Sequence, residues 1–328
     1  TPVEPVRRKI LLIALVLGFL IPMVVIYIRE KANTTVRGRK DLKKVNVPFL
    51  GEIPFSISRK NRPTLEQRIK FWKKPKEVRM IVVKAGKRDI VNEAFRVLRT
   101  NFEFTIGTHP EQNVIVFTSF NPGSGKSHIA ANMAMSLAIK KKKVLLIDGD
   151  LRHGSTSMLI HSPGEGLSDY LNGRITDIHD ILYKGEENGL VKGFDVIPIG
   201  TIPPNPTELL FTPLLEQMIK TMREEYDYVF IDCPPIEVVA DTPIYEQFAD
   251  RTIFVVRAGL MERSMLPEVN ALYKEKKFKN MTLILNGTKA QGGRYGSHYG
   301  YGYGYGYGYN YNKEKNGGGK ILNNWIIE

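Results

Sequence analysis

Cysteine is nearly absent from this sequence, since Cys233 is the only one among 328 residues. A single thiol excludes a disulfide framework and any metal or iron–sulfur site that needs several cysteines. We therefore expect the folded part of the chain in a reducing compartment. The length leaves room for one sizeable globular domain with terminal extensions, and hardly for a second large domain.

Acidic residues are also in short supply, with 34 Asp and Glu against 47 Lys and Arg. The imbalance is local, because residues 29–79 hold sixteen basic and five acidic residues and so account for eleven of the thirteen surplus charges. This stretch is expected to be a basic juxtamembrane linker at the surface of anionic lipid, where each cation adds about 1 kcal/mol of attraction. Nucleic acid is the alternative partner, and we rank it below the membrane.

Charge is missing altogether from Ile10 to Ile28, a run of nineteen residues. That is close to the roughly 20 residues needed to cross a bilayer, and Pro22 is tolerable in a membrane helix. A cleaved signal peptide is the alternative, but the run exceeds an h-region of 7–15 residues and no Ala-x-Ala site follows. More cations follow the run than precede it, which places the C-terminal side in the cytoplasm. The cations that follow are Arg29, Lys31, Arg37, Arg39, Lys40, Lys43 and Lys44, and those that precede are Arg7, Arg8 and Lys9.

The sequence begins at Thr1 without an initiator methionine. We expect residues 1–9 to be the end of an extracytoplasmic segment in a longer protein. The domain is expected over residues 80–290.

A strand–helix alternation begins at Val114 and predicts an α/β fold. The first apolar run, 114–119, is followed by a glycine-rich turn and by a helix with apolar residues at helical spacing. Further strands are expected at 144–147, 194–197, 228–231, 252–256 and 282–285. Strands separated by helical stretches predict a doubly wound, mostly parallel sheet with ligands at the carboxyl ends of the strands.

The turn from Ser119 to Ser127 reads Ser-Phe-Asn-Pro-Gly-Ser-Gly-Lys-Ser and is typical of a phosphate-binding loop. Its glycines allow backbone N–H groups to point at phosphate, Lys126 reaches the β and γ oxygens, and Ser127 holds Mg²⁺. Phe120 occupies the position of the first glycine in the strict pattern, and a chance glycine-rich turn is the alternative. The expected nucleotide-binding residues are Asn121, Pro122, Gly123, Ser124, Gly125, Lys126, Ser127 and His128.

Three carboxylates stand at or beside the ends of predicted strands, namely Asp148, Asp150 and Asp232. Carboxylates at these ends converge on the phosphates, where one binds Mg²⁺ and another takes a proton from a nucleophile. We expect Ser127, Asp148 and Asp232 to hold the metal, while the division between base and ligand stays open for Asp148 and Asp150. Asn286, after the last strand, is a candidate for reading adenine, with a turn residue as the alternative.

The segment 291–328 holds eight of the fifteen tyrosines, mostly alternating with glycine. Such a composition cannot bury a core, so we expect a disordered and accessible tail. Next to an ATP site these phenols are expected phosphate acceptors, and a sticky linker or aggregation-prone tract is the alternative. The eight are Tyr295, Tyr299, Tyr301, Tyr303, Tyr305, Tyr307, Tyr309 and Tyr311.

These motifs together resemble those of the bacterial tyrosine kinases (BY-kinases), membrane autokinases of capsule and exopolysaccharide chain-length regulators. The turn 119–127, the segment 147–152 (Ile-Asp-Gly-Asp-Leu-Arg) and the segment 230–235 (Phe-Ile-Asp-Cys-Pro-Pro) match the Walker A, A′ and B motifs. The resemblance implies a P-loop fold of the MinD-like type, ATP and Mg²⁺ as cofactors, and Lys126, Asp148, Asp150 and Asp232 as catalytic residues. The family's periplasmic domain is absent from this sequence, and residues 312–328 match nothing in the family.

An upstream helix carries the family's E-x-x-R-x-x-R motif as Glu93, Arg96 and Arg99. Its Phe95, Leu98 and Phe102 form an apolar stripe, which leaves the motif on more polar faces. A solvated face is the alternative, but the resemblance implies that the motif docks on an adjacent subunit and closes a ring, an octamer in the family.

The resemblance further implies location in the bacterial inner membrane, with a cytoplasmic kinase domain and tail. It implies a tyrosine phosphatase of the low-molecular-weight or PHP type and a polysaccharide polymerase and export machinery as partners, and no nucleic acid. We expect phosphorylation of a neighbour's tail to dissolve the ring. Two other functions remain open, a switch ATPase and a non-catalytic co-polymerase scaffold. The switch class usually has a lysine where this chain has Asn121, and the tail tyrosines favour the kinase over both.

Overall fold

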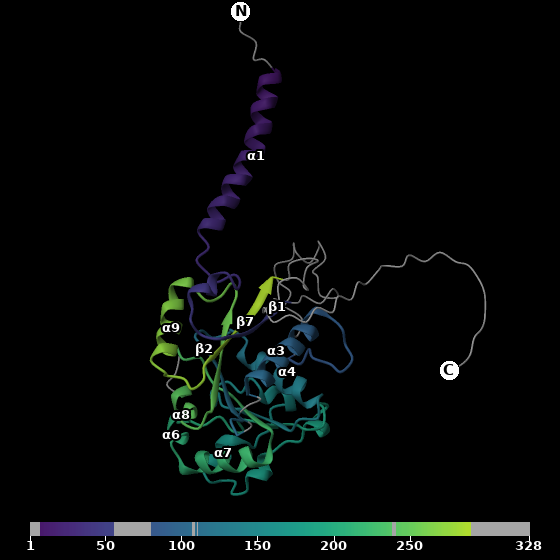
Figure 1. Cartoon of the computed structure of the whole chain (residues 1–328), viewed down its shortest axis with the longest axis vertical. Coiled ribbons are helices and arrows are strands. Elements are labelled where there is room, and N and C mark those ends of the chain that lie inside the picture. Colours follow the sequence, from purple (N-terminus) through teal and green to yellow (C-terminus); the bar gives the residue numbers. More distant parts are fainter. Residues whose placement is uncertain (1–6, 56–79, 107–108, 110, 238–240, 290–328) are drawn as a thin grey trace, which may run out of the picture. The chain divides into compact units, whose positions relative to one another are not determined.

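The computed structural model describes residues 7–55, 80–106, 109, 111–237 and 241–289. Its centre is a seven-stranded sheet in the order β1-β7-β6-β2-β5-β3-β4, in which all neighbouring strands run parallel (Figure 1). The predicted doubly wound parallel sheet is therefore confirmed. The strands are β1 (Phe49–Phe55), β2 (Val114–Ser119), β3 (Val144–Asp148), β4 (Phe194–Ile197), β5 (Tyr228–Asp232), β6 (Arg251–Arg257) and β7 (Thr282–Lys289).

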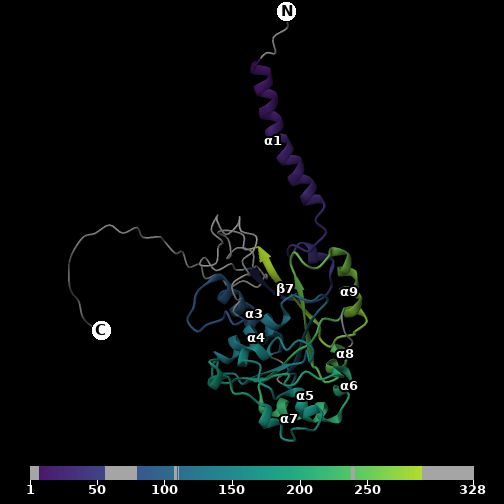
Figure 2. The same ribbon diagram turned by 180° about the vertical axis from the view of Figure 1, so that it is seen from behind.

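Helices cover both faces of this sheet, because successive strand residues point to opposite sides. Ile115 and Phe117 of β2 face the core under α3 and α4, whereas Val114 and Val116 face the core under α5, α7 and α8. The views in Figures 1 and 2 both show α3 beside α4. The helices are α1 (Arg7–Lys31), α3 (Ile90–Ile106), α4 (Lys126–Ala138), α5 (Leu167–Leu171), α6 (Pro206–Leu209), α7 (Pro213–Glu225), α8 (Thr242–Glu246) and α9 (Leu266–Lys274).

The basic stretch that was expected to be a linker is folded in part, which corrects the expected domain boundary at residue 80. The Val36 N–H donates to the Met261 carbonyl at 2.8 Å, and β1 pairs with β7. Val36, Leu42 and Val47 are buried against α9 and the strands β6 and β7. Each such side chain contributes about 1.5–3 kcal/mol. The folded domain therefore begins before β1, although its charge pattern is that of a solvated segment.

Strand β1 lies at the edge of the sheet, and its sequence shows why pattern alone missed it. It contains Gly51 and Pro54, two residues that weaken a central strand but are tolerated at an edge. Gly51 also lets β1 approach α3, since a Cβ there would lie 2.9 Å from the Leu98 side chain. The strand is therefore specified by its packing on α3.

The buried side-chain amide of Asn132 in α4 forms hydrogen bonds with the segment that precedes α3. The Asn132 Oδ1 accepts from the Val82 and Val83 N–H groups at 2.8 and 3.0 Å, and its Nδ2 donates to the Met80 carbonyl at 2.7 Å. Asn132 is fully buried, so each of these bonds replaces one that the backbone would otherwise make with water. The helix that carries the P-loop lysine is thus tied to the segment that leads into α3.

Helix α1 contains the predicted membrane span. Its apolar part, Ile10–Ile28, has a mean hydropathy of 2.9 and is long enough to cross a bilayer, and none of it is buried inside the protein. Pro22 lies inside the helix without ending it. By length and composition this helix is a candidate membrane span.

Candidate active site

The loop between β2 and α4 has the backbone of a phosphate cradle. Gly123 and Gly125 have φ values of +73° and +88°, a region that glycine enters without strain. The hydroxyls of Ser119 and Ser124 both donate to the Asn121 carbonyl, at 2.9 and 2.7 Å. These bonds tie both ends of the segment 119–124 to the Asn121 carbonyl.

Phe120 explains how the loop differs from the strict P-loop pattern. Its backbone has no positive φ, so the position does not need glycine. Its side chain is 6% exposed and packs in the cluster that contains Val36 and Phe254. The aromatic ring therefore anchors the start of the loop to the core.

Helix α4 begins at Lys126, directly after the loop, and points its N-terminus at the site. The first intrahelical bond of this turn runs from the Ile129 N–H to the Gly125 carbonyl. The N–H groups of Lys126, Ser127 and His128 therefore have no partner within the helix. Such a helix end attracts anions, which fits a phosphate at this point.

Two carboxylates end neighbouring strands beside the loop. Asp148 of β3 and Asp232 of β5 are partners in the strand register, and Phe117 of β2 is the partner of Asp232 on its other side. Gly149 makes the close approach possible, because a Cβ there would lie 3.1 Å from the Asp232 carbonyl oxygen. The sheet topology thus brings the predicted carboxylates next to the predicted P-loop.

Asp148 is fully buried, and one of its two carboxylate oxygens accepts hydrogen bonds. Its Oδ2 accepts from the Ser157 N–H and the Ser157 hydroxyl, both at 2.7 Å. Its Oδ1 has no partner among the described residues. Burial raises the pKa of Asp148, and the hydrogen bonds from Ser157 counteract that rise. Ser157 was not predicted, and nothing in the sequence distinguishes it from other turn serines.

Asp232 is more isolated, because neither of its carboxylate oxygens has a hydrogen-bond partner among the described residues. Burial raises the pKa of Asp232 to about 7, and the nearby Asp148 raises it while the Lys126 ammonium lowers it. A group with such a pKa at a strand end beside a P-loop is typical of a site that receives a cation or moves a proton.

Asp150 lies in the turn after β3 and is 4% exposed. Its Oδ1 is 3.3 Å from the Arg152 N–H and 3.3 Å from Nδ1 of His153. Its charge contributes to the raised pKa values of Asp148 and Asp232, so the three carboxylates share one region. The division of base and ligand roles between Asp148 and Asp150 stays open.

Tyr245 of α8 is a buried polar group of this region that the sequence analysis missed. Its ring lies under Gly149, 3.2 Å from a Cβ built there, and the residue is fully buried. Its hydroxyl has no partner within the described part of the chain. The motif residues alone gave no signal for it, because it comes from a short helix thirteen positions after Asp232.

The remaining predicted nucleotide residues surround the loop. Asn121 donates from Nδ2 to Oε2 of Glu237 at 2.8 Å, and Pro122 is exposed. The His128 ring packs edge-on against Phe95 of α3 with centroids 6.1 Å apart, and its backbone N–H lies in the first turn of α4. Asn286 donates to the Ser124 carbonyl at 2.9 Å, which places it against the P-loop.

The carboxylates and the loop serine fit Mg²⁺. Asp148 Oδ1 and both oxygens of Asp232 are buried and have no hydrogen-bond partner in the part of the chain that the structure describes, and hard oxygen ligands are those that Mg²⁺ prefers. Ser127 lies in the first turn of α4, directly after Lys126, where the P-loop pattern has the hydroxyl that binds Mg²⁺. Ser127, Asp148 and Asp232 are therefore the residues that would hold the metal with the nucleotide.

The three motif residues of α3, the predicted interface helix, differ in exposure and in hydrogen-bond partners. Glu93 and Arg96 are solvent-accessible and form an ion pair at 2.8 Å. Arg99 is 9% exposed and donates to the Ser136 carbonyl of α4 at 2.8 Å. The expectation that Arg99 lies on a face available to a neighbour is wrong for this chain, because its guanidinium is used between α3 and α4.

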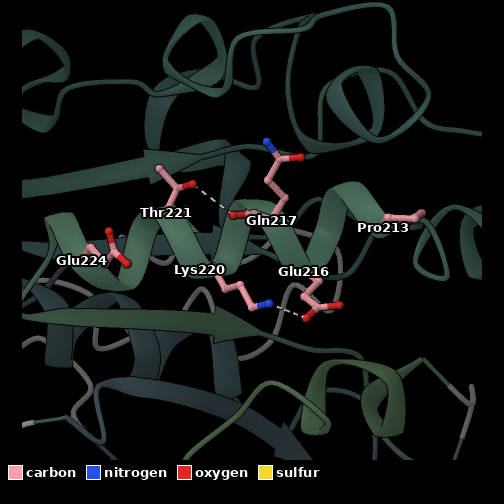
Figure 3. Close-up of a pocket in the computed structure, with 6 residues that line it drawn as sticks. All are labelled: Pro213, Glu216, Gln217, Lys220, Thr221 and Glu224. Atoms are coloured by element: carbon pink, nitrogen blue, oxygen red, sulfur yellow. Dashed lines mark hydrogen bonds and ion pairs between the residues drawn. The ribbon is translucent and has the colours of Figure 1, made fainter.

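A shallow depression on α7 is lined by residues of that helix alone, none of which was predicted to be functional. Figure 3 shows its side chains, including the Glu216–Lys220 ion pair at 2.7 Å. The lining residues are Pro213, Glu216, Gln217, Lys220, Thr221 and Glu224. Lys220 pairs with Glu216, and the Thr221 hydroxyl donates to the Gln217 carbonyl at 3.0 Å, so these polar groups are used within the helix.

The fold and these strand-end motifs define a P-loop nucleotide-binding domain. A family model described as an AAA domain matches residues 112–258, which include the P-loop and the three carboxylates. The tyrosine-protein kinase wzc of Salmonella typhimurium is 33% identical over 260 residues, 77% of this chain and 34% of that protein. The tyrosine-protein kinase CpsD of Streptococcus agalactiae is 33% identical over 208 residues, 63% of this chain and 87% of that protein.

Solved structures agree with these sequence relatives. The kinase domain of Escherichia coli tyrosine kinase ETK has a TM-score of 0.65 and 29% identity, and the match covers 83% of this chain and 100% of that domain. The chain spans about a third of the length of wzc and most of CpsD. The chain belongs to the bacterial tyrosine kinase family, and the predicted resemblance is confirmed.

The raised pKa of Asp232 predicts how stability depends on pH without nucleotide or metal. An unfolded Asp titrates near 3.9, so between about pH 4 and pH 7 the native state binds more protons and the free energy of unfolding falls as pH rises. Asp232→Asn should therefore raise the free energy of unfolding at pH 8 by about 2–4 kcal/mol and flatten this decline. Urea titrations followed by circular dichroism at several pH values measure both effects.

The control is Asp180→Asn, at an exposed position, which should change stability by less than about 0.5 kcal/mol. A loss of stability in Asp232→Asn at pH 8 would contradict the prediction.

Proposed function

We propose that this chain is an ATP-dependent protein-tyrosine kinase that phosphorylates the Tyr295–Tyr311 segment of a neighbouring subunit within a ring. One observation supports this most, the meeting of the P-loop with the unpartnered oxygens of Asp148 and Asp232 at the ends of adjacent strands. The named kinases among the relatives support the same reaction class.

The chain's own groups would bind and orient the triphosphate. The loop amides and the first turn of α4 surround the phosphates, and Lys126 neutralises negative charge on the γ-phosphate as it is transferred. Bound Mg²⁺, held by Ser127 and Asp232, would neutralise further phosphate charge, and Asp148 would either join these metal ligands or accept the phenol proton. Pre-arranged groups of this kind act without reorganising at the moment of reaction, which is the main source of catalysis in phosphoryl transfer.

The transfer forms one bond and breaks one. The phenol oxygen attacks the γ-phosphorus, the bond to the β–γ bridging oxygen breaks, and ADP leaves. The phenol proton moves to a carboxylate, either Asp148 or Asp150. A raised pKa suits Asp148 to this role because it brings the proton affinity of the carboxylate nearer to neutral pH.

Burial of the other tyrosines supports the tail as acceptor. The seven tyrosines outside the tail all lie in the described part of the chain, and only Tyr27, within the apolar span of α1, is exposed. Tyr226 is typical, since its hydroxyl donates to Asp195 at 2.8 Å inside the domain. The tail itself lies outside the described residues. The seven are Tyr27, Tyr170, Tyr183, Tyr226, Tyr228, Tyr245 and Tyr273.

Transfer between subunits requires an assembly, for which α3 remains the proposed contact. The side chains of Glu93 and Arg96 are 56% and 34% exposed, whereas Arg99 is committed to α4. We therefore assign the contact to Glu93 and Arg96, with Arg99 fixing α3 to the domain behind them. The number of subunits follows from the family resemblance, which implies an octamer.

The cellular setting is proposed from the apolar helix and the relatives. The span Ile10–Ile28 would anchor the chain in the bacterial inner membrane, with the domain and tail in the cytoplasm. Each added phosphate brings about −1.5 to −2 charges, so a heavily phosphorylated tail is repelled by a neighbour's carboxylates. The ring would then dissolve and a phosphatase reset it, coupling phosphorylation to capsule or exopolysaccharide synthesis and export.

Lys126→Met tests the proposed phosphate site. The substitution removes the charge that stabilises the γ-phosphate while leaving the start of α4 intact, so phosphotyrosine per chain should fall at least about a hundredfold. A quantitative anti-phosphotyrosine blot after incubation with Mg-ATP measures this, with circular dichroism to show that the fold survives. Undiminished phosphotyrosine would place the reaction elsewhere.

Tyrosine replacements test the proposed acceptors. Because the eight tail tyrosines alternate with glycine in a segment that we expect not to fold, each single Tyr→Phe change should lose only a fraction of the phosphate. Replacing all eight should abolish most of it, while ATP hydrolysis persists because the tail supplies no catalytic group. Mass spectrometry locates the phosphates. Phosphate found mainly on Tyr226 or Tyr228 would reject the tail as substrate.

The double change Glu93→Ala and Arg96→Ala tests the assembly. It removes the accessible ion pair of α3 and leaves Arg99 in place, so a folded, ATP-binding monomer should result, with much less phosphotyrosine. Light scattering in detergent measures the mass. The matched control is Glu216→Ala with Lys220→Ala, which removes an exposed helical ion pair of α7 (Figure 3) and should leave the oligomer intact. An unchanged oligomer in the α3 variant would show that this face of α3 is exposed to solvent and makes no subunit contact.

A further inference from the structure

Two side chains from the ends of β6 and β7 hold consecutive carbonyls of the P-loop. The Arg257 Nη1 donates to the Gly123 carbonyl at 2.5 Å, and Nδ2 of Asn286 donates to the Ser124 carbonyl at 2.9 Å. Arg257 and Asn286 are partners in the register of the two strands. The two donors therefore form one unit at the edge of the loop, carried by rigid neighbouring strands.

Because the peptide bond is planar, a contact that fixes the direction of a carbonyl also fixes the direction of the N–H that follows it and that would bind phosphate. In a trans peptide the C=O and the following N–H point in opposite directions. A carbonyl held outward by Arg257 or Asn286 therefore turns the N–H of Ser124 or Gly125 the opposite way, away from the two strands. Two consecutive N–H groups fixed in this way are the donors that a P-loop offers to phosphate.

The packing around Gly125 shows that the fit is tight. A Cβ at Gly125 would lie 2.3 Å from Nδ2 of Asn286, and the glycine has a φ of +88°. Gly287, directly after Asn286, has a φ of +76° and accompanies a register shift of β7 against β1. The bend in β7 and the missing side chain at Gly125 together let the Asn286 amide reach the loop.

We infer that Arg257 and Asn286 are positioning residues that orient the P-loop amides toward phosphate, and that Asn286 serves this purpose in place of reading adenine. The inference rests on the proposed nucleotide binding and deepens it. The hydrogen bond from Nδ2 of Asn286 to the loop backbone contributes equally to every ligand with a polyphosphate, whatever base it carries.

Binding of a base-free ligand tests the inference. The full chain in detergent is titrated calorimetrically with ADP and with inorganic tripolyphosphate. Arg257→Met and Asn286→Ala should each weaken both ligands by the same factor, about tenfold, the size of one lost charge-assisted or buried hydrogen bond. Arg257→Lys keeps a cationic donor and should retain more affinity than Arg257→Met.

The control is Arg251→Met at the other end of β6, where Arg251 donates to Gln112 at 2.8 Å, and it should bind both ligands as the unaltered chain does. If Asn286→Ala weakens ADP but not tripolyphosphate, Asn286 reads the base and the inference is overturned. If both variants bind tripolyphosphate normally, the inference fails while the proposed function stands. If the unaltered chain binds neither ligand, the proposed function fails and the inference with it. Should Arg257→Met not fold, Asn286→Ala and Arg257→Lys still decide the result.

Discussion

Two carboxylates buried side by side, Asp148 and Asp232, impose an electrostatic cost that the surrounding site is arranged to offset. Their strands are neighbours, so the like charges cannot separate, and burial removes the water that would otherwise solvate them. Lys126 supplies one positive charge nearby, and Ser157 satisfies one oxygen of Asp148. The remaining oxygens have no hydrogen-bond partner among the described residues, and such hard oxygen atoms are the ligands that a cation such as Mg²⁺ prefers.

The same topology explains how the loop and the carboxylates stay in register. Strand β2 pairs with β5 and β5 pairs with β3, so Asp232 ends the strand next to the P-loop and Asp148 ends the strand beyond it. On the other side of β2, strands β6 and β7 supply Arg257 and Asn286, which donate hydrogen bonds to two carbonyls of the loop. Arg257 and Asn286 therefore contact the loop from one side, and Asp232 ends the strand on its other side. The place of the site thus follows from the order of the strands in one sheet.

Sequence reasoning located the parts of this site whose chemistry is local. The glycine-rich turn, Lys126 and the strand-end carboxylates were predicted because residue type and position along a strand suffice to place them. Other features depend on contacts distant in sequence. The sequence predicts a linker where strand β1 lies, because Gly51, Pro54 and nearby cations obscure a pattern that only packing against α3 and β7 reveals. Arg99 was expected on an accessible face, but the proximity of α4 turns it inward. Arg257 had no local signal at all, since its role appears only once the loop lies beside β6.

The central claim is that the γ-phosphate passes to a tyrosine and not to water, and the chemical fate of that phosphate tests it most directly. The purified full chain is incubated with Mg²⁺ and ATP labelled on the γ-phosphate, and the products are separated into inorganic phosphate and acid-hydrolysed phosphoamino acids. The account predicts label in phosphotyrosine, accumulating on the chain as ATP is consumed. Label released entirely as inorganic phosphate, with none in phosphotyrosine, would contradict it and identify a switch ATPase on the same fold.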